Sequence, residues 1–430
     1  MDNATIQIET CDVLVVGGGP AGIAAACVAD SAGAKVILVD DNSIAGGQIW
    51  RTRRRHPQAG LAGEWLGRLA GCGIQKLFGW RIVAMPEPRL FLAESRNGVR
   101  FLQCRKLILA TGARELFLPF PGWTLPGVVG AGAMQALTKS GLNVRGKRVL
   151  LAGSGPLLLA VAAHLKHAGA QVPFIAEQAS AANLRRFAIK LAGRPGKLLQ
   201  AVGLWRRIRP LRLYPDSWPL RVEQADNGLR VVMRVGGNDN IQEVDYLACG
   251  FGLVPNCELA ALVGCDILPE GFVRVKADQS TSIDWIYAAG ELTGIGGVDK
   301  SLAEGQVAAR TAVGQPIDAT LRKEQITARR FAGMLAKTFA LRPQVRNLAQ
   351  ADTIVCRCED ISLGAVNNRR DARDIKLQTR CGMGPCQGRI CGPILQMLAL
   401  PHEMPVRPPI QPCRLETLAA EACGAAEKSD

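Results

Sequence analysis

A glycine-rich turn near the N-terminus constrains the fold of this chain most. The apolar run CDVLVV occupies 11–16, and Gly17, Gly19 and Gly22 follow it in the pattern G-x-G-x-x-G. In a strand–turn–helix unit, the first glycine makes the tight turn and the second lets the backbone approach a diphosphate. The third lets the helix pack closely on the strand. The pattern therefore predicts a dinucleotide-binding unit in a parallel α/β fold.

The residues around this turn support the same interpretation. Pro20 and Ala21 belong to the GGGPAG turn at 17–22 and join its glycines as expected cofactor-binding residues. An Ala-rich helix follows the turn to about residue 32, and a second apolar strand over 35–39 ends at Asp40. A diphosphate is expected at the helix N-terminus, where free N–H groups favour negative charge. Asp40 lies at the usual distance along the chain for accepting a hydrogen bond from a ribose hydroxyl. A purely structural turn is the alternative, and the strand context with the acid at 40 disfavours it.

A second unit of the same kind begins near residue 147. The strand KRVLLAG leads into Gly153 and Gly155, a helix is predicted over 157–168, and the next strand ends at Glu177. Leu158 stands at the third glycine position and is expected to crowd the helix against the strand. Three hypotheses stay open for this unit: NAD, another adenine nucleotide such as ATP or ADP, and an empty structural remnant. A carboxylate at 177 would repel a 2′-phosphate, so NADP is not supported.

Composition limits the function classes. The 430 residues carry a formal charge of +15, which suits nucleic acid, anionic cofactors or an acidic protein partner. No nucleic-acid-binding motif is visible, so nucleic acid is discounted. The chain has no apolar stretch of membrane-spanning length and no N-terminal signal pattern, so we expect no transmembrane segment and a cytoplasmic protein. An acidic, Ala-rich tail over 414–430 is expected to fray.

Five of the fourteen cysteines crowd into one short segment. They are Cys356, Cys358, Cys381, Cys386 and Cys391, in VCRCED and LQTRCGMGPCQGRICGP. In a reducing cytosol, clustered cysteines favour a metal over disulfides. Four thiolates can hold a [2Fe-2S] cluster, and tetrahedral zinc is the chemical competitor. Unliganded thiols are the remaining alternative.

Two later segments carry a resemblance to a known superfamily. Ala110, Thr111 and Gly112 follow a predicted strand, and YAAGE at 287–291 precedes a helix start rich in small residues. Over about 10–315 the chain resembles the flavoprotein disulfide reductases with two dinucleotide domains, the glutathione reductase-like fold. The resemblance implies FAD, closed over by the ATG segment and by Gly290 and Glu291, where the family usually has Asp. The cysteine pair that its thiol-disulfide members carry beside the flavin is missing, so we reject a disulfide reductase activity.

The cysteine segment resembles the bacterioferritin-associated ferredoxin-like [2Fe-2S] domain. This resemblance implies Cys356 and Cys358 as ligands directly. The second pair is ambiguous, because 381/386 and 386/391 are both C-x4-C. We favour Cys386 and Cys391, which leave the longer spacer, with Cys381 as a neighbour or a true ligand.

Nearly the whole chain resembles a narrower family. These are the α (A-type) subunits of heteromeric bacterial amino- and imino-acid dehydrogenases, such as the A-type subunit of opine oxidase, D-hydroxyproline dehydrogenase and the B-type subunit of hydrogen cyanide synthase. The marks are DVLVVGGGPAGIAAA, GGQIWR, ATGARE, GSGPLLL, AAGELTGIGG and CRCED…TRCGMGPCQGRICGP. Gly47 and Gln48 of GGQIWR join the implied cofactor residues.

The resemblance implies a division of labour between subunits. Substrate oxidation would take place on a separate flavin-containing β subunit, and this chain would pass electrons to an acceptor. Two open additions are a small third subunit, and peripheral attachment to the inner membrane through partners. Two alternatives remain, a stand-alone NAD(P)H-dependent ferredoxin-type reductase and a non-catalytic scaffold that carries cofactors. No substrate acid/base set is visible in the sequence, so the catalytic residues are unknown.

The predicted fold is α/β, with two Rossmann-like dinucleotide-binding domains and a small C-terminal [2Fe-2S] domain. The FAD-binding domain is predicted over 1–120 and 250–320, and the second nucleotide-binding domain over 121–249. A helical connector over 321–349 leads to the [2Fe-2S] domain at 350–413 and the tail at 414–430.

Overall fold

The computed structural model describes residues 8–50, 60–402 and 406–426. The chain divides into two compact units. The first comprises 1–114, 255–333 and 405–430, and the second comprises 115–254 and 334–404. Helix α10 (Ala319–Thr338) and strands β7 (Ala113–Glu115) and β16 (Leu253–Pro255) lie where the chain passes between units.

The first unit is built on a seven-stranded sheet. Its strands are β1 (Ile8–Val16), β2 (Val36–Asp40), β3 (Gln75–Phe78), β4 (Arg81–Glu87), β5 (Leu90–Ser95), β6 (Gly98–Leu109) and β17 (Ile286–Ala288). The order is β3-β2-β1-β6-β5-β4, with β17 also paired to β6. Strands β3, β2, β1, β6 and β17 are mutually parallel, whereas β5 and β4 add an antiparallel edge.

Helices and loops cover both faces of this sheet. Its helices are α1 (Pro20–Ser31), α2 (Gly47–Trp50), α3 (Leu61–Gly71), α8 (Glu258–Leu262), the 3-10 helix η1 (Gly290–Thr293), α9 (Val298–Ala312) and α15 (Leu415–Ala426). Val13 and Val15 of β1 pack with α1, α3 and α9 in one core. Leu14 and Val16 point to the opposite face and pack in a second core with α8. This alternation is the expected pattern of a strand buried on both sides.

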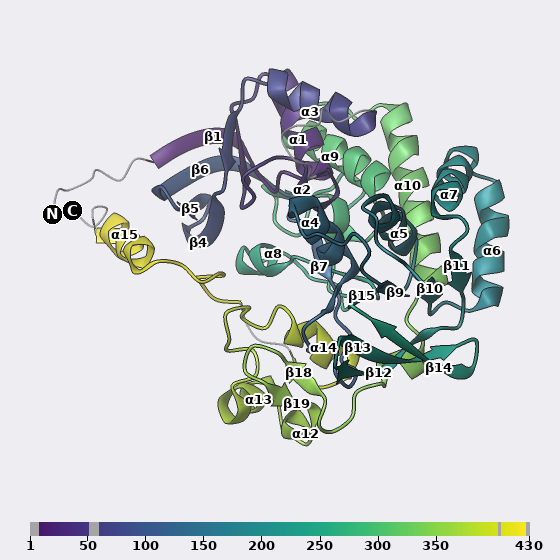
Figure 1. Ribbon diagram of the computed structural model, residues 1–430. Coiled ribbons are helices and arrows are strands. Elements are labelled where there is room, and N and C mark those ends of the chain that lie inside the picture. The colour runs from purple at the N-terminus through teal and green to yellow at the C-terminus, as the bar shows by residue number, and fades with distance from the viewer. Residues whose placement is uncertain (1–7, 51–59, 403–405, 427–430) are drawn as a thin grey trace. The chain divides into compact units, whose positions relative to one another are not determined.

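The second unit contains a five-stranded parallel sheet and a three-stranded antiparallel one. The parallel strands are β8 (Val128–Gly130), β9 (Val149–Gly153), β10 (Phe174–Glu177), β11 (Arg212–Tyr214) and β15 (Tyr246–Gly250), in the order β11-β10-β9-β15-β8. The antiparallel strands are β12 (Trp218–Ala225), β13 (Gly228–Val235) and β14 (Asn238–Val244). The labels in Figure 1 follow this numbering.

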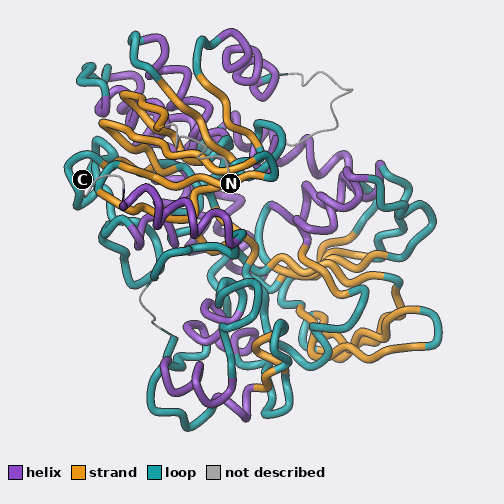
Figure 2. Tube along the Cα trace, turned by 90° about the vertical axis from the view of Figure 1, so that its left-hand side faces the viewer, coloured by secondary structure: helices purple, strands orange, loops and turns teal. Residues whose placement is uncertain are grey.

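The helices and short strands of the second unit complete its two cores. They are α4 (Ala131–Ser140), α5 (Leu157–His167), α6 (Ala181–Ala192), α7 (Pro195–Ile208), α11 (Pro343–Arg346), β18 (Ile354–Cys356), β19 (Ile361–Ser362), α12 (Leu363–Val366), α13 (Ala372–Thr379) and α14 (Cys391–Met397). Val149 and Leu151 of β9 pack against α4, α5 and α7. Leu150 and Ala152 face the other core, which also holds side chains of β13 and of the cysteine segment. Figure 2 distinguishes these helices, strands and loops by colour.

Two internal segments for which the sequence predicted no regular elements form regular structure. The described part of 41–100 forms α2, α3, β3, β4, β5 and the start of β6. The basic stretch 180–222 forms α6, α7, β11 and the start of β12.

Where the structure describes the C-terminal tail, it forms α15 (Leu415–Ala426) and begins with two hydrogen bonds to β5. Thr417 is fully buried, and its hydroxyl donates to Glu94 Oε2 at 2.5 Å. The backbone N–H of Arg414 donates to the same oxygen at 2.9 Å. These two hydrogen bonds satisfy the buried carboxylate of Glu94 on β5, and they therefore hold the start of the tail against that strand.

Within the described residues, no helix combines the length and apolar character that a bilayer crossing requires.

Candidate cofactor sites

The first glycine loop is held tightly between β1, β6 and α1. Gly17 has φ +113°, and a Cβ there would collide with the carbonyl oxygen of Ala110. A Cβ on Gly22 would collide with the carbonyl oxygen of Gly17. Gly19 is the N-cap of α1 and Pro20 its first residue, so the free N–H groups of the first turn are available to an anion. The backbone here fits a dinucleotide diphosphate.

Asp40 reaches the same loop from the end of β2. Its Oδ2 accepts a hydrogen bond from the backbone N–H of Gly18. Its Oδ1 accepts from the backbone and side-chain nitrogens of Asn42, each at 2.7 Å. Only 8% of Asp40 is exposed. The predicted ribose acceptor therefore stands beside the glycine loop, with both oxygens oriented by the protein.

Gly46 and Gly47 lie against the loop from the other direction. The backbone N–H of Gly46 donates to Gly18 O at 2.8 Å. Gly47 has φ +57°, and a Cβ on it would lie 2.9 Å from the Cα of Gly19. Gln48 follows in α2 and is exposed. The backbone of Gly46 and Gly47 thus lies directly beside the glycine loop, while Arg51 of the same motif is outside the described residues.

The segment after β6 continues the same surface. The backbone N–H of Ala110 donates to Val16 O at 2.8 Å. The Thr111 hydroxyl donates to Asn256 O at 2.7 Å, and the Asn256 amide donates back to Thr111 O at 2.8 Å. Gly112 takes φ +68°. Asn256 had not been singled out from the sequence, and its reciprocal bonds fix the ATG turn.

Gly290 brings the YAAGE segment to the first turn of α1. It has φ +83°, and a Cβ there would lie 2.8 Å from the Cβ of Ala21. Glu291 turns toward its own loop, and its two oxygens accept from Gly296 N at 3.0 Å and Gly297 N at 2.7 Å. Burial raises the pKa of the Glu291 carboxyl. A ribityl hydroxyl would have to share this carboxylate with the two amides.

A buried charged group beneath this segment had no counterpart in the sequence expectations. Lys300 Nζ donates to Gly290 O and Thr293 Oγ1, each at 2.8 Å, and lies 2.7 Å from Glu304 Oε2. Arg329 Nε lies 2.8 Å from the other oxygen of Glu304. Burial acts to raise the pKa of Glu304, but the Lys300 and Arg329 cations hold that pKa below its usual value. The sequence did contain one indication of this ion pair, namely Lys300 and Glu304 four residues apart on a helix made mostly of small residues.

The second glycine loop is covered by the protein's own chain. Glu177 is 2% exposed and accepts from Gly155 N at 2.7 Å and Ala179 N at 2.8 Å. Burial raises the pKa of Glu177 to about 7. The Ser154 hydroxyl donates to Phe339 O at 3.1 Å, and a Cβ on Gly155 would lie 3.6 Å from the Phe339 ring. Phe339 therefore lies on the surface where a nucleotide diphosphate would approach.

The leucine at the third position of this loop fits without strain. Gly153 takes φ +156°, and a Cβ on it would collide with the backbone of Gly250. A Cβ on Gly250 would in turn lie 3.3 Å from Leu158 Cδ2. The crowding expected from Leu158 is relieved by a glycine on the neighbouring strand.

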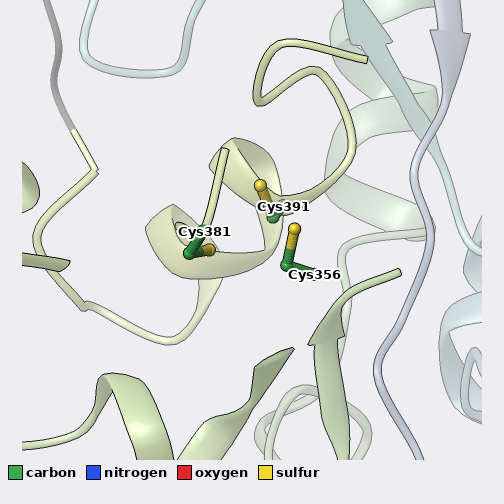
Figure 3. Close-up of side chains that lie close together, drawn as sticks. All are labelled: Cys356, Cys381 and Cys391. Atoms are coloured by element: carbon green, nitrogen blue, oxygen red, sulfur yellow. The ribbon is translucent and has the colours of Figure 1, made fainter. Parts of the chain in front are cut away.

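Three of the five clustered cysteines meet in the second unit. The Sγ atoms of Cys356, Cys381 and Cys391 lie within 4.8 Å of one another, and all three residues are buried. They come from the end of β18, the turn after α13 and the first residue of α14 (Figure 3). Hydrogen bonds from the Cys381 and Cys391 thiols lower the pKa of Cys356.

Cys358 and Cys386 adjoin this group as a second pair. Their side chains are hydrogen-bonded to each other, and Cys358 also accepts from the backbone N–H of Cys386. A Cβ on Gly384 would collide with the Cβ of Cys358, so the glycine permits this approach. Burial raises the pKa of Cys358, and the Cys386 and Cys356 thiols add to that rise. The five cysteines thus form a close group of three, Cys356, Cys381 and Cys391, and an interacting pair, Cys358 and Cys386.

A comparison with models of known protein families identifies the family of this chain. A family model described as pyridine nucleotide-disulphide oxidoreductase matches residues 11–312. The chain belongs to this family. Members of the pyridine nucleotide-disulphide oxidoreductase family are oxidoreductases, and membership implies a flavoprotein that binds FAD. The resemblance inferred from the glycine loops and the YAAGE segment is confirmed at this level.

Individual relatives within the family extend the match to the full chain. The A-type subunit of opine oxidase from Rhizobium meliloti (strain 1021) is 32% identical over 454 residues, which cover 95% of this chain and 98% of the relative. The hydrogen cyanide synthase subunit HcnB of Pseudomonas aeruginosa is 31% identical, covering 88% and 90%. The narrower resemblance to this group of subunits is thereby confirmed.

A solved structure shares the fold of this family member. The L-proline dehydrogenase from P. horikoshii superposes with a TM-score of 0.69 at 20% sequence identity, covering 96% of this chain and 80% of that one. At this identity the likeness shows the fold alone. It supports the predicted α/β architecture.

Proposed function

We propose that this chain is the electron-transferring FAD and [2Fe-2S] subunit of a heteromeric dehydrogenase that oxidises an amino or imino acid. Candidate substrates are D-hydroxyproline, proline and opines. The observation that carries the proposal is the presence, in one chain, of a glycine loop shaped for a dinucleotide and of a buried group of three cysteines with an interacting cysteine pair in the same segment. Two relatives are named as subunits, one of opine oxidase and one of hydrogen cyanide synthase, which supports a place in a larger enzyme.

The first unit would hold FAD through backbone and carboxylate groups. Gly17, Gly19 and Gly22 would receive the diphosphate and Asp40 the adenosine ribose, as their geometry allows. The rest of the cofactor would lie along three further segments: GGQ at 46–48, ATG at 110–112, and Gly290 with Glu291. FAD, when bound, accepts an electron pair and can release the electrons one at a time.

The cysteine segment would hold the [2Fe-2S] cluster. We assign Cys356, Cys358, Cys386 and Cys391 as ligands and Cys381 as a buried neighbour, with Cys381 as the alternative to Cys391. Thiolate ligands must lose their protons, and backbone N–H groups favour that charge. Gly382 and Glu359 donate such hydrogen bonds to Cys356.

The second glycine loop would be structural in this chain. Phe339 lies against Gly155, and Gln178 holds the following residue by donating to Ala340 O at 3.2 Å. A dinucleotide bound in the usual manner would displace this contact. This argues against the stand-alone NAD(P)H-dependent reductase, which needs an open second site.

A partner would supply the substrate chemistry. We propose a flavin-containing β subunit that carries the substrate site, together with an acceptor that takes electrons from this chain. A small third subunit is compatible with the same scheme.

The test begins with anaerobically purified chain, in which flavin, iron and zinc are quantified. We expect one FAD and about two irons per chain. Flavin without iron, or zinc in place of iron, would refute the cluster assignment. Reduction is then followed in the visible spectrum. Bleaching by NADH alone would support the reductase, bleaching by an imino acid only with the co-expressed partner would support the proposal, and no redox response would support a scaffold.

A further inference from the structure

Helices α6 and α7 present apolar side chains to solvent. Ile189 on α6 is 75% exposed, and on α7 Leu199 is 72% and Trp205 42% exposed. Leu198 and Val202 of α7 are also exposed. A group of large apolar side chains exposed to water is uncommon on a soluble protein and usually marks a surface that binds another protein or a membrane.

The same two helices carry an unusual charge distribution. Between Glu177 and Asp216 the sequence contains no Asp or Glu. It contains nine cationic residues there: Arg185, Arg186, Lys190, Arg194, Lys197, Arg206, Arg207, Arg209 and Arg212. Within the described part of the chain, Arg185, Arg186 and Arg206 are exposed and form no ion pair. The segment is therefore both apolar and strongly cationic.

The apolar and cationic side chains share the outer side of the helix pair. On α7, Leu198, Val202 and Trp205 recur at helical spacing and are all exposed, whereas Ile208 is fully buried. The exposed Arg209 follows as the C-cap of the helix. Ile208 packs in the core with α5, which lies next to α7 (Figure 1). On α6, Arg185 and Ile189 are exposed and four residues apart, and Leu191 is buried. The inner side of the pair is thus anchored and the outer side faces solvent.

We propose that the α6–α7 pair docks directly on an anionic lipid surface. A helix that lies in a membrane interface has an apolar face edged by Lys and Arg, often with Trp at the polar boundary. The cations match the negative surface of phospholipid headgroups. An acidic protein partner would also match the charge, but it would have to bury the apolar side chains of both helices in a complementary groove. No helix among the described residues spans a membrane, so the attachment would be peripheral. This inference is independent of the FAD and cluster assignments.

The direct test is co-sedimentation of the purified full chain with vesicles. One set is phosphatidylcholine and the other contains phosphatidylglycerol as well. We expect binding to the anionic vesicles that weakens with salt, and little binding to the neutral ones. Equal binding to both sets would overturn the charge argument. Binding to heparin or an acidic protein without binding to anionic vesicles would assign the surface to a different partner and overturn the proposal.

Two variants separate the two parts of the surface. Each cation near an anionic bilayer contributes about 1 kcal/mol, so Arg185→Glu with Arg206→Glu should lower the partition coefficient by at least roughly tenfold. Leu199→Ser with Trp205→Ser should lower it by a comparable factor, because apolar burial is lost. The matched control is Ile326→Ser with Arg330→Glu on α10, where a 43% exposed Ile and an exposed Arg are also four residues apart. That control should bind as the wild type does.

A spectroscopic measurement locates the contact. Trp205 fluorescence, obtained as the difference between the wild type and Trp205→Phe, should shift to the blue on addition of anionic vesicles. Unchanged circular dichroism and flavin content would show that each variant is folded. Vesicle binding that survives both surface variants in folded protein would overturn the proposal.

Discussion

Lys300 Nζ lies 2.7 Å from Glu304 Oε2, and both side chains are buried in the first unit. The pair also holds the turn that precedes α9, because Lys300 donates to Gly290 O and Glu304 accepts from Gly290 N at 3.1 Å. The ion pair thus fixes both polar backbone atoms of the glycine that lies against α1. Its removal should be felt at the proposed FAD site.

Replacing Lys300 by Met tests this relationship. The change leaves Glu304 buried with Arg329 as its remaining cation and should cost about 3 kcal/mol of unfolding free energy. We also expect weaker FAD retention, measured as the dissociation constant from flavin fluorescence. The control is Lys323→Met on α10, an exposed position. Unchanged FAD affinity in a folded Lys300→Met variant would show that the pair has no positioning role.

Gly22→Ala should disrupt the first glycine loop. The added Cβ would collide with the carbonyl oxygen of Gly17, so the helix must move away from the strand. We expect protein with little bound FAD and a lower midpoint of thermal unfolding.

The matched control is Gly67→Ala in α3, where a Cβ would meet open space. That change should leave FAD binding intact and raise helix stability by up to about 1 kcal/mol. Equal FAD content in the two variants would contradict the cradle described at Gly22.

Single Cys→Ser variants distinguish ligands from neighbours in the cysteine segment. Iron per chain should fall sharply in Cys356→Ser, Cys358→Ser, Cys386→Ser and Cys391→Ser. It should stay near the wild-type value in Cys381→Ser and in the control Cys72→Ser, which lies in the first unit. Loss of iron in Cys381→Ser with retention in Cys391→Ser would exchange the roles of these two residues.

Glu177 should make the stability of the second unit depend on pH. Its pKa is raised from 4.5 to about 7 in the folded protein, so the unfolded state ionises first as the pH rises. The contribution to stability is complete below pH 4.5 and is lost by about pH 7, a change of roughly 3 kcal/mol. Glu177→Gln cannot ionise. Its thermal midpoint should therefore rise relative to the wild type between pH 5 and pH 8.

The exposed Glu243→Gln on β14 is the control, and its difference from the wild type should not vary in this range. A wild-type midpoint that tracks Glu177→Gln across the range would contradict the raised pKa.

The sequence was most informative where local chemistry determines the backbone. The run 11–22 predicted β1, the turn and α1 closely, because buried strands and glycine turns leave short-range patterns. Asp40 was expected at the loop from chain spacing alone, and its carboxylate does bond to Gly18. Strand β3 was missed because it pairs with β2, far back in the chain. Strands β4 and β5 were missed although they form local hairpins, because their burial does not alternate along the strand.

The site features that the sequence did not indicate are long-range contacts. Arg329 reaches Glu304 across 25 residues, and Phe339 meets Ser154 across 185. Neither partner belongs to a motif, so only the folded chain brings them together. For the cysteines, spacing identified the segment, but the proximity of Cys381 to Cys356 depends on the turn after α13.

The cysteine segment shares its core with the second nucleotide sheet. Val355, Cys356 and Ile394 pack in the same cluster as Val231 of β13, and the Trp123 indole donates to Ile354 O at 2.6 Å. The last strand of the parallel sheet in this unit, β15, ends at Gly250. The sheet is therefore synthesised well before Cys391, the last cysteine of the segment. If the segment binds the proposed cluster, metal loading would be a late event in biogenesis. A peptide cut out of the chain at 350–402 would lack the β-sheet against which its cysteines pack.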